Sequence, residues 1–435
     1  MLNFLKKNKT KSFKAIGGND IVYTPIYHND AVSIVHDACV VCVDGKKERT
    51  LEQKFDFIAG KVKLGHESIL EHSNYIVKLE FESDDNYYIN ALYEIMDSLK
   101  FLNVKTKVYT GDNNTITSKG NRKSVIKNNT VGDNCVICGG DLIVNNNSKS
   151  KSKYTILIGG SARGYKHVVR TVANYKNPVY LALLDYIKLE LPSCFFSDLI
   201  EEGIFRKLDF MDVISKENGY HNKDYRSCIN KDLQSVGKVL AVDPIKDIYN
   251  KLNGEFSYYE LMDFCMVNTV SVNVSRSCSH QEVRHRAAIT QLSQRYVDMG
   301  DSIELNSLIE DEDIDLSEFF NTDSPLSLST HEYMKFSKFV YNKLIEKGWK
   351  KEDARFLLPN LTATTLYMSY TFRGLFKAIE LREGKGAQKE IKQVFKCLES
   401  EFKTNLDVTE LEGYTIHDYI LPRYDFESLE SSRAK

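Results

Sequence analysis

The sequence predicts an α+β protein. Short runs that are β-branched or that alternate apolar with polar residues predict strands, while longer stretches with apolar residues at helical spacing predict helices. The hydrophobic share of 42% and the charged share of 27% are those of a folded globular protein. A chain of 435 residues can bury one large core or two to three ordinary ones.

Three segments have the patterns of strands. Residues 31–43, AVSIVHDACVVCV, form a continuous apolar and β-branched run that predicts a buried strand. Residues 73–81, SNYIVKLEF, alternate in the way that a half-buried strand requires. Residues 266–275, MVNTVSVNVS, predict a third strand, and Ser275 is placed to cap a short helix through residue 284.

Four further segments have the spacing of helices. Residues 50–65 predict a helix that Gly65 ends, and residues 331–348 predict an amphipathic helix that ends at a glycine. Residues 350–358, KKEDARFLL, predict a short helix with acidic residues in its first turn. Residues 362–382, TATTLYMSYTFRGLFKAIELR, contain no proline and predict one long helix.

The character of the chain changes from residue 83 to residue 265. Tracts rich in Asn, Ser, Lys and Gly separate segments that look folded, which is the pattern of an insertion. Within it, residues 154–172 predict a strand, a glycine turn and a helix, and residues 177–191 have an apolar helical pattern.

Charge and hydropathy narrow the classes of function. No apolar run reaches the roughly 18 residues that span a bilayer, and the start has no apolar segment typical of a secretory signal, so we expect a cytoplasmic protein without a membrane helix. The net charge of −2 gives no overall attraction to nucleic acid, so none is expected as a partner. Nine cysteines, an odd number, indicate reduced thiols.

Two C-x-x-C pairs raise the question of zinc. Cys39 and Cys42 lie in the predicted strand, where residues three apart point to opposite faces and cannot chelate one ion together. Cys135 and Cys138 are followed by glycine as in a metal knuckle, but no further ligands stand nearby. We therefore expect no metal site.

The most informative stretch is residues 279–296, SHQEVRHRAAITQLSQRY. On a helix that ends near residue 284, Gln281 shares a face with Arg284 and with His285. Arginine suits phosphate oxygens, and glutamine offers the paired donor and acceptor that can read a base edge. The alternative interpretation is a solvated charged face, and periodicity alone does not exclude it.

The order and spacing of residues in this motif resemble the signature of the flavin-dependent thymidylate synthases, the ThyX family. Three other stretches match in the order that the family requires: GHESILEH at 65–72, ARFLLP at 354–359, and R-x4-AQ-x-EI beginning at Arg382. The resemblance covers residues 30–82 and 266–410. It implies a ThyX-like catalytic core of mixed or antiparallel sheet with flanking helices, formed by residues 21–82 and 266–420, around a large α/β-type insertion of unknown role at 83–265. Residues 1–20 are then a flexible N-terminal segment and residues 421–435 a C-terminal tail.

The resemblance also implies the residues of the site. The residues that match the family's dUMP-binding positions are Gln281, Arg284, Gln291, Ser293, Arg295, Arg355 and Arg382. The residues that match its flavin-holding positions are His72, Arg284, His285, Arg286, Thr371, Arg373 and Lys377. Arg382 is the catalytic candidate, because it matches the arginine placed against the uracil ring. Ser293 is interpreted as a phosphate binder, and Cys278 as a packing residue.

The implied activity is reductive methylation of dUMP to dTMP with FAD as cofactor and methylenetetrahydrofolate and NADPH as co-substrates. The family's sites are shared among the subunits of a homotetramer, so a homotetramer is expected here. Two alternatives stay open: a flavin-dependent C5 methylase or hydroxymethylase of another pyrimidine nucleotide, and a non-catalytic nucleotide- or RNA-binding relative. Bound flavin separates the two classes.

Three departures from the family pattern bear on substrate and flavin. The spacing AAITQL between RHR and Ser293 is one residue shorter than usual, in what we expect to be a loop. Thr371 and Lys377 stand where the family often has asparagine.

On the predicted long helix, Thr371 would share a face with Arg382, and Arg373 would lie roughly opposite Arg382.

Overall fold

In the computed structural model, the chain is described over a set of separate ranges. They are residues 11–14, 20–43, 48–83, 105–110, 114–119, 125–126, 141–146, 152–161, 236–253, 256, 258–297, 299, 312–320 and 326–405. The structure concerns these residues alone. The expected helices after residue 162 and at 177–191 lie outside them.

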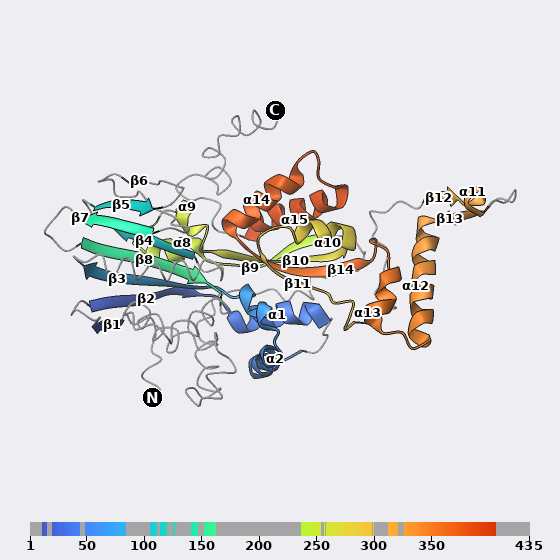
Figure 1. Ribbon diagram of the computed structural model, residues 1–435, viewed down its shortest axis with the longest axis horizontal. Coiled ribbons are helices and arrows are strands. Elements are labelled where there is room, and N and C mark those ends of the chain that lie inside the picture. The colour runs from blue at the N-terminus through green and yellow to red at the C-terminus, as the bar shows by residue number, and fades with distance from the viewer. Residues whose placement is uncertain are drawn as a thin grey trace.

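A five-stranded antiparallel sheet forms one end of the molecule (Figure 1). Its strands, in spatial order, are β1 (Lys11–Lys14), β2 (Asp20–His28), β3 (Tyr75–Ser83), β8 (Ser152–Gly160) and β4 (Lys105–Thr110). The alternation at 73–81 thus predicted β3 correctly. A smaller antiparallel sheet contains β6 (Val125–Ile126), β5 (Asn114–Lys119) and β7 (Asp141–Asn146).

A four-stranded antiparallel sheet forms the centre. Its spatial order is β11 (Ala288–Gln291), β14 (Ala363–Thr371), β10 (Met266–Ser275) and β9 (Val236–Val242). The strand predicted at 266–275 is β10, with identical bounds. The confirmed fold class is therefore α+β with antiparallel sheets.

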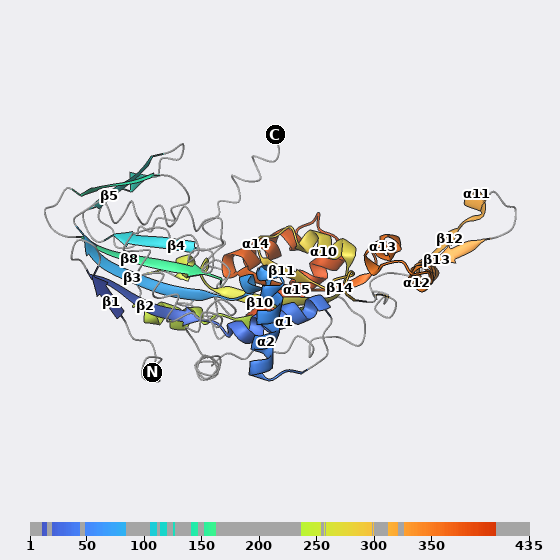
Figure 2. The same cartoon turned by 60° about the horizontal axis from the view of Figure 1, so that its bottom comes forward.

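Helices cover both faces of this central sheet (Figures 1 and 2). One layer contains α10 (Arg276–Glu282), α14 (Phe372–Glu383) and α15 (Lys389–Asn405). The other contains α1 (Ala31–Val43), α2 (Leu51–Lys63) and the 3-10 helix η1 (Glu67–His72). Thr50 caps α2 through a capping box, and Gly65, at φ +87°, ends it as predicted.

The strand predicted at 31–43 is wrong, because these residues form α1. All of α1 up to Val41 except Ser33 is buried, so an apolar run without a polar face fits a buried helix as well as a buried strand. Its length favours the helix, and the Asp30 carboxylate accepts a hydrogen bond from Ser33 N at 3.1 Å at its start. Cys39 and Cys42 therefore lie one turn apart on one side of a helix, both as free thiols.

The long helix predicted at 362–382 is also wrong. Residues 363–371 form β14, which pairs with β10 on one side and β11 on the other, and only residues 372–383 are helical. The two Thr residues at 364–365 and the aromatic residues of this run suit a central strand. Thr371 then caps α14 by accepting a hydrogen bond from Gly374 N at 3.1 Å.

The two larger sheets share one hydrophobic core. Ile26 and Ile76 of the five-stranded sheet belong to the same buried cluster as Val267 and Leu366 of the central sheet. Asp243 fixes this junction: its carboxylate accepts hydrogen bonds from Tyr27 Oη at 2.9 Å, Asn74 Nδ2 at 2.6 Å and Met266 N at 2.7 Å. Burial raises the pKa of Asp243 to about 6, so the group is ionised at neutral pH.

A third group of elements projects away from the central sheet (Figure 1). They are β12 (Asp313–Asp315), α11 (Ser317–Phe320), β13 (Ser327–Ser329), α12 (Thr330–Glu346), α13 (Lys351–Ala354) and the 3-10 helix η5 (Arg355–Leu357). Ser329 starts α12 with a capping box, and Gly348, at φ +86°, follows its end as predicted. Trp349, the single tryptophan of the chain, is 51% exposed and so does not lie in a core.

The strand pairing bears on the predicted domain boundaries. Strands from the expected insertion join both larger sheets: β8 pairs with β3, and β9 pairs with β10. Between β9 and β10 in the chain, α8 (Ile245–Lys251) and α9 (Tyr258–Leu261) place Ile248 and Leu261 in the shared core. The boundary at residue 265 stays a prediction, and we propose that the catalytic core begins before β9. None of the helices in the described ranges is long and apolar enough to cross a bilayer.

Candidate active site

The RHR motif follows directly from the end of α10. Ser275 caps this helix as predicted, since its Oγ accepts a hydrogen bond from Cys278 N at 3.0 Å. The helix ends at Glu282, two residues earlier than expected. Arg284 and Arg286 are exposed, and neither has an ion pair among the described residues.

Arg382 reaches from the last turn of α14 to the end of α10. Its Nε donates to His285 Nε2 at 2.7 Å, and its Nη2 donates to the Gln281 carbonyl at 2.8 Å. The Gln281 carbonyl is one of the last carbonyls of a helix, which attract a cation. These two bonds join the predicted catalytic arginine to the RHR segment, although 97 residues separate Arg382 from His285.

His285 is held in its neutral form. Burial, and then the charge of Arg382, lower its pKa to about 4. A neutral imidazole keeps one ring nitrogen free as an acceptor, and here that atom is Nε2. His285 therefore orients the guanidinium without competing with it for an anion.

The side chain of Gln281 is bonded to the third matched motif. Its Nε2 donates to Gln388 Oε1 at 2.6 Å, and Gln388 lies in the R-x4-AQ-x-EI stretch that begins at Arg382. This contact leaves the Gln281 Oε1 atom as the part of the amide that can accept from a ligand.

A second group of predicted residues surrounds Glu352. Arg295 forms an ion pair with Glu352 at 3.4 Å, and Arg355 Nε donates to the Glu352 carbonyl at 3.1 Å. Ser293 Oγ accepts from Arg295 N at 3.2 Å. The structure therefore brings Ser293, Arg295 and Arg355 into one neighbourhood.

Sequence reasoning missed Arg276 in this neighbourhood. Burial lowers the pKa of Arg276, and the nearby charge of Arg355 lowers it further, so the two cations lie close together. Two adjacent cations are the pattern of an anion site. The position of Arg276 directly after the N-cap Ser275 was the available signal.

The segment between RHR and Ser293 is a strand and not the expected loop. Residues 288–291 form β11, which pairs with β14. The apolar Ile289 alternates with the polar Thr290, and both residues are β-branched, which suits an edge strand. Gln291, at its end, points its amide at Ser279 Oγ, to which it donates at 2.9 Å.

His72 is buried under this sheet. Its Nδ1 contacts Ser369 Oγ at 2.7 Å and its Nε2 contacts Thr290 Oγ1 at 2.9 Å. Ser369 donates to Asn268 Oδ1, so it accepts from Nδ1–H, and Nε2 is the acceptor. Burial lowers the pKa of His72 to about 3, so the ring is neutral. The structure places His72 away from the surface, and its flavin contact stays a prediction.

The remaining flavin candidates lie at the start of α14. Arg373 Nε forms an ion pair with Asp263 Oδ1 at 2.9 Å, and Lys377 is exposed one turn further. Thr371 is the N-cap and not a helical residue, so the expected alignment of Thr371 with Arg382 on one helix is wrong. Arg373 and Arg382 do lie on the same helix, nine residues apart and on roughly opposite sides.

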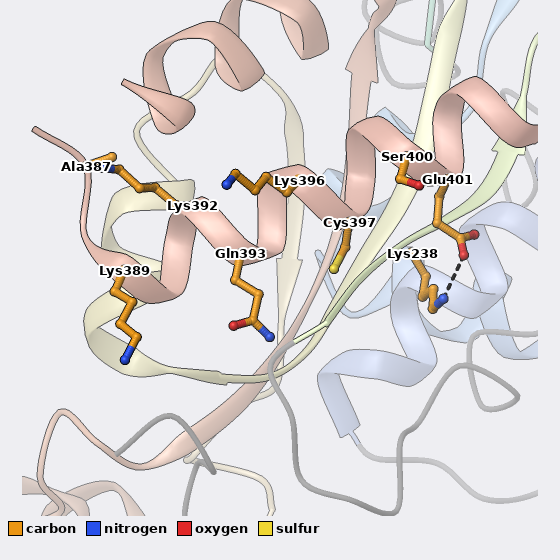
Figure 3. Close-up of a pocket in the computed structure, with 9 residues that line it drawn as sticks. All are labelled: Lys238, Ala387, Lys389, Lys392, Gln393, Lys396, Cys397, Ser400 and Glu401. Atoms are coloured by element: carbon orange, nitrogen blue, oxygen red, sulfur yellow. Dashed lines mark hydrogen bonds and ion pairs between the residues drawn. The ribbon is translucent and has the colours of Figure 1, made fainter. Parts of the chain in front are cut away.

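Apart from the buried His72, the candidate residues are exposed or partly exposed. The groove of about 730 Å³ in Figure 3 lies elsewhere, along α15 and the edge of β9, where Lys238 pairs with Glu401 at 2.6 Å. None of the predicted site residues lines that groove. Among the described residues, no group of three His, Cys, Asp or Glu side chains is arranged to hold a metal. Cys135 and Cys138 lie outside the described residues.

Comparisons with known proteins point to the same family as the motifs. The model of the Thy1 family, described as thymidylate synthase complementing protein, matches residues 227–406. The flavin-dependent thymidylate synthase of Thermococcus kodakarensis is 34% identical over 152 residues, which are 34% of this chain and 60% of that protein. That of Pyrococcus horikoshii is 40% identical over 127 residues, 29% of this chain and 50% of that protein. The chain thus spans about half to three fifths of the length of these relatives.

Two solved structures were also matched. Thymidylate synthase X from Helicobacter pylori, with FAD and dUMP, gives a TM-score of 0.28 at 17% identity and covers 38% of this chain and 92% of that one. The UMP/dUMP methylase PolB from Streptomyces cacaoi, bound with 5-Br dUMP, gives 0.29 at 16% identity, covering 39% and 90%.

Proposed function

We propose that this chain, whose residues 227–406 match the Thy1 family model, is a flavin-dependent thymidylate synthase that methylates dUMP to dTMP. The observation that carries the proposal is the contact of Arg382 with both Gln281 and His285. It joins two matched motifs in the way that one shared substrate site requires.

In this proposal Arg382 acts by charge. Negative charge develops on the uracil ring when hydride is added, and a guanidinium already fixed nearby stabilises that charge without losing a proton. The bond to His285 Nε2 uses the single Nε–H, and the bond to the Gln281 carbonyl uses one N–H of Nη2. The remaining N–H groups of the fork are available to the substrate.

The phosphate of dUMP is assigned to the second group of residues. Arg295 and Arg355 both contact Glu352, and Arg276 lies near Arg355. Ser293, whose Oγ accepts from Arg295 N, has a hydroxyl that can donate to a phosphate oxygen. Ser293 has no base beside it among its described contacts, so it serves as a binder and not as a nucleophile. Separate cation groups for ring and phosphate match the two ends of one nucleotide.

The residues present fit FAD as cofactor. Arg284 and Arg286 are exposed guanidinium groups, and such groups suit the pyrophosphate of a dinucleotide. Arg373 and Lys377 supply further cations at the start of α14. When bound and reduced by NADPH, the flavin would supply the hydride, and methylenetetrahydrofolate would supply the one-carbon group.

A homotetramer is part of the proposal. The candidate residues other than His72 are exposed or partly exposed and do not line the groove along α15, while binding sites for small molecules are generally concave. A neighbouring subunit that covers this surface would complete the site. Exposed aromatic residues on α12 support an interface between copies of the chain.

Product analysis tests the proposal. The purified protein is expected to absorb in the flavin region or to take up FAD, and to convert dUMP to dTMP when methylenetetrahydrofolate and NADPH are present. Offering dUMP, dCMP and UMP in turn, with mass analysis of each product, identifies the pyrimidine and the group added. Product from dCMP or UMP but not from dUMP would contradict the substrate assignment. A protein that cannot bind FAD would contradict the activity and favour a nucleotide-binding relative.

A further inference from the structure

The groove along α15 lies apart from the residues assigned to dUMP and to flavin. Its volume of about 730 Å³ is that of a site for a small molecule. Most of its lining residues belong to α15, and Lys238 comes from β9, the last strand of the central sheet in the part of the chain that the structure describes (Figure 3). The function proposed above gives this groove no role.

The packing of α15 decides which of its residues face the groove. Gly237 on β9 has no side chain, so Leu398 of α15 lies directly on the strand; a Cβ at Gly237 would be 2.6 Å from Leu398 Cγ. Residues three and four apart share a side of a helix. Lys389, Lys392 and Lys396 have this spacing, and they lie on the side of α15 away from Leu398.

Positive charge collects in the groove. Its lysines are Lys238, Lys389, Lys392 and Lys396. The one acid that lines it, Glu401, is paired with Lys238 at 2.6 Å. Lys392 donates to the Lys385 carbonyl at 3.2 Å, and neither Lys392 nor Lys396 has a carboxylate partner among the described residues. The groove is therefore cationic, although the whole chain has a net charge of −2.

Helix stability does not account for these lysines. α15 begins at Lys389, so Lys389 and Lys392 lie in its first turn, where the helix dipole disfavours cations. Lys392 and Lys396 are four residues apart and repel each other. The acid of the first turn, Glu390, is buried and accepts from Ser275 N at 2.7 Å, so it faces inward. An anion in the groove would offset both unfavourable terms.

The spacing of the lysines indicates the kind of anion. Lys389 and Lys396 are seven residues apart, or about 10 Å along the helix axis. Each ammonium group is a compact point charge on a flexible stem, which suits phosphate oxygens. A row of such charges suits several phosphate groups in one ligand better than a single phosphate. Gln393, which also lines the groove, offers a donor and an acceptor to the same ligand.

We propose that the groove along α15 binds a small molecule that carries several phosphate groups, as a nucleoside triphosphate or a phosphorylated dinucleotide does. Lys389, Lys392 and Lys396 hold the phosphates by charge, and Gln393 forms hydrogen bonds with the ligand. The inference goes beyond the function proposed above and does not depend on it.

The test is calorimetric titration of the purified protein with inorganic tripolyphosphate, and with orthophosphate for comparison. We expect tripolyphosphate to bind and orthophosphate to bind far more weakly, because only the longer anion reaches several lysines. Lys392→Gln combined with Lys396→Gln removes two of the charges and should weaken tripolyphosphate binding on the order of tenfold. Both side chains are exposed or partly exposed, so circular dichroism should show an unchanged fold.

Lys335→Gln combined with Lys347→Gln is the matched control. It removes the same charge from two exposed positions, on α12 and at its end, and α12 projects away from the central sheet (Figure 1). This protein should bind tripolyphosphate as the wild type does. ATP and NADP+ are then offered as competitors, and the one that displaces tripolyphosphate at the lower concentration identifies a nucleoside triphosphate or a dinucleotide as the source of the phosphates.

Three results would overturn the inference. They are a wild type that binds tripolyphosphate no better than orthophosphate, equal binding by the wild type and the Lys392→Gln, Lys396→Gln protein, and equal weakening in the matched control. Should the double variant fail to fold, Lys396→Glu at an exposed position decides, because reversing one charge should also weaken binding. None of these results bears on dUMP methylation, which product analysis tests separately.

Discussion

Arg382 carries the proposed chemistry, and removing its charge should affect turnover far more than flavin binding. Arg382→Ala is expected to retain FAD and to lose about 3 kcal/mol of transition-state stabilisation, or about two orders of magnitude in kcat. Arg382→Lys should recover little, because a lysine cannot donate to both the Gln281 carbonyl and His285 with the same geometry. Steady-state kinetics and the flavin spectrum of each variant provide the measurement.

Lys385→Ala is the control for this prediction, since Lys385 is an exposed cation three residues away. It should behave as the wild type. Turnover by Arg382→Ala at the wild-type rate would exclude Arg382 from the chemistry.

His72 gives a second prediction, on stability and pH. Its folded pKa of about 3 lies below the ordinary value of 6.5, so the unfolded chain binds a proton that the folded chain does not. The stabilising contribution is therefore complete above pH 6.5 and declines as the pH falls toward 3. Between pH 6.5 and pH 5 this loss should amount to about 2 kcal/mol.

His72→Gln cannot titrate but can still meet the Ser369 and Thr290 hydroxyls. Its stability is expected to fall less steeply than that of the wild type over the same pH interval, as measured by urea unfolding at each pH. Equal slopes for the two proteins would show that His72 is protonated in the folded state.

At the scale of elements, two glycines predict opposite effects of one substitution. A Cβ at Gly237 on β9 would lie 2.6 Å from both the Val394 carbonyl oxygen and Leu398 Cγ of α15. Gly237→Ala should therefore push α15 from the sheet and cost roughly 1–3 kcal/mol. A Cβ at Gly60, inside α2, would meet no atom within 4 Å beyond its own helix, so Gly60→Ala should stabilise by up to about 1 kcal/mol.

Thermal unfolding of the two variants beside the wild type checks both signs. A Gly237→Ala protein as stable as the wild type would mean that α15 does not pack so closely on β9.

The strands and helices differ in how well their sequences predicted them. β10 was predicted residue for residue, because β-branched residues alternate along it and Ser275 marks the next helix. α1 and β14 were assigned the wrong type for the same physical reason: both are buried along almost all of their length, and burial on every side removes the period that distinguishes a helix from a strand.

The candidate site was predicted from motifs and not from periodicity. The contacts among Arg382, Gln281 and His285 join segments that no local pattern relates, so resemblance to a family was the only available guide. Arg276 escaped notice because its role depends on what packs around it. A half-buried cation and an exposed cation look alike in a sequence.

At the scale of the whole molecule, Asp243 connects the two larger sheets. Three donors from β2, from the residue before β3 and from β10 converge on its carboxylate. Asp243→Asn replaces one acceptor oxygen with an NH2 group that faces donors, so it should destabilise the protein by about 1–3 kcal/mol at neutral pH.

Tyr27→Phe removes only one of the three donors and serves as the milder comparison, expected to cost about 1 kcal/mol. Urea unfolding of the three proteins gives the measurement. An Asp243→Asn protein that loses less stability than Tyr27→Phe would argue that the carboxylate does not hold the two sheets together.

The exposed aromatic residues of the projecting helix α12 lead to a prediction about the assembly of subunits. Tyr333, Phe336 and Phe339 follow one another at three-residue spacing and are 45%, 58% and 57% exposed. Neighbouring aromatic residues this exposed form an apolar patch of the kind that subunits bury. Phe336→Asp combined with Phe339→Asp should therefore lower the mass of the particle measured by light scattering, with the subunit still folded by circular dichroism.

Lys335→Glu adds a carboxylate beside Phe336 without removing apolar surface, and should leave the mass nearly unchanged. A wild type that is already monomeric would contradict the proposed tetramer. If dUMP turnover declines together with the mass, the site must draw residues from more than one subunit.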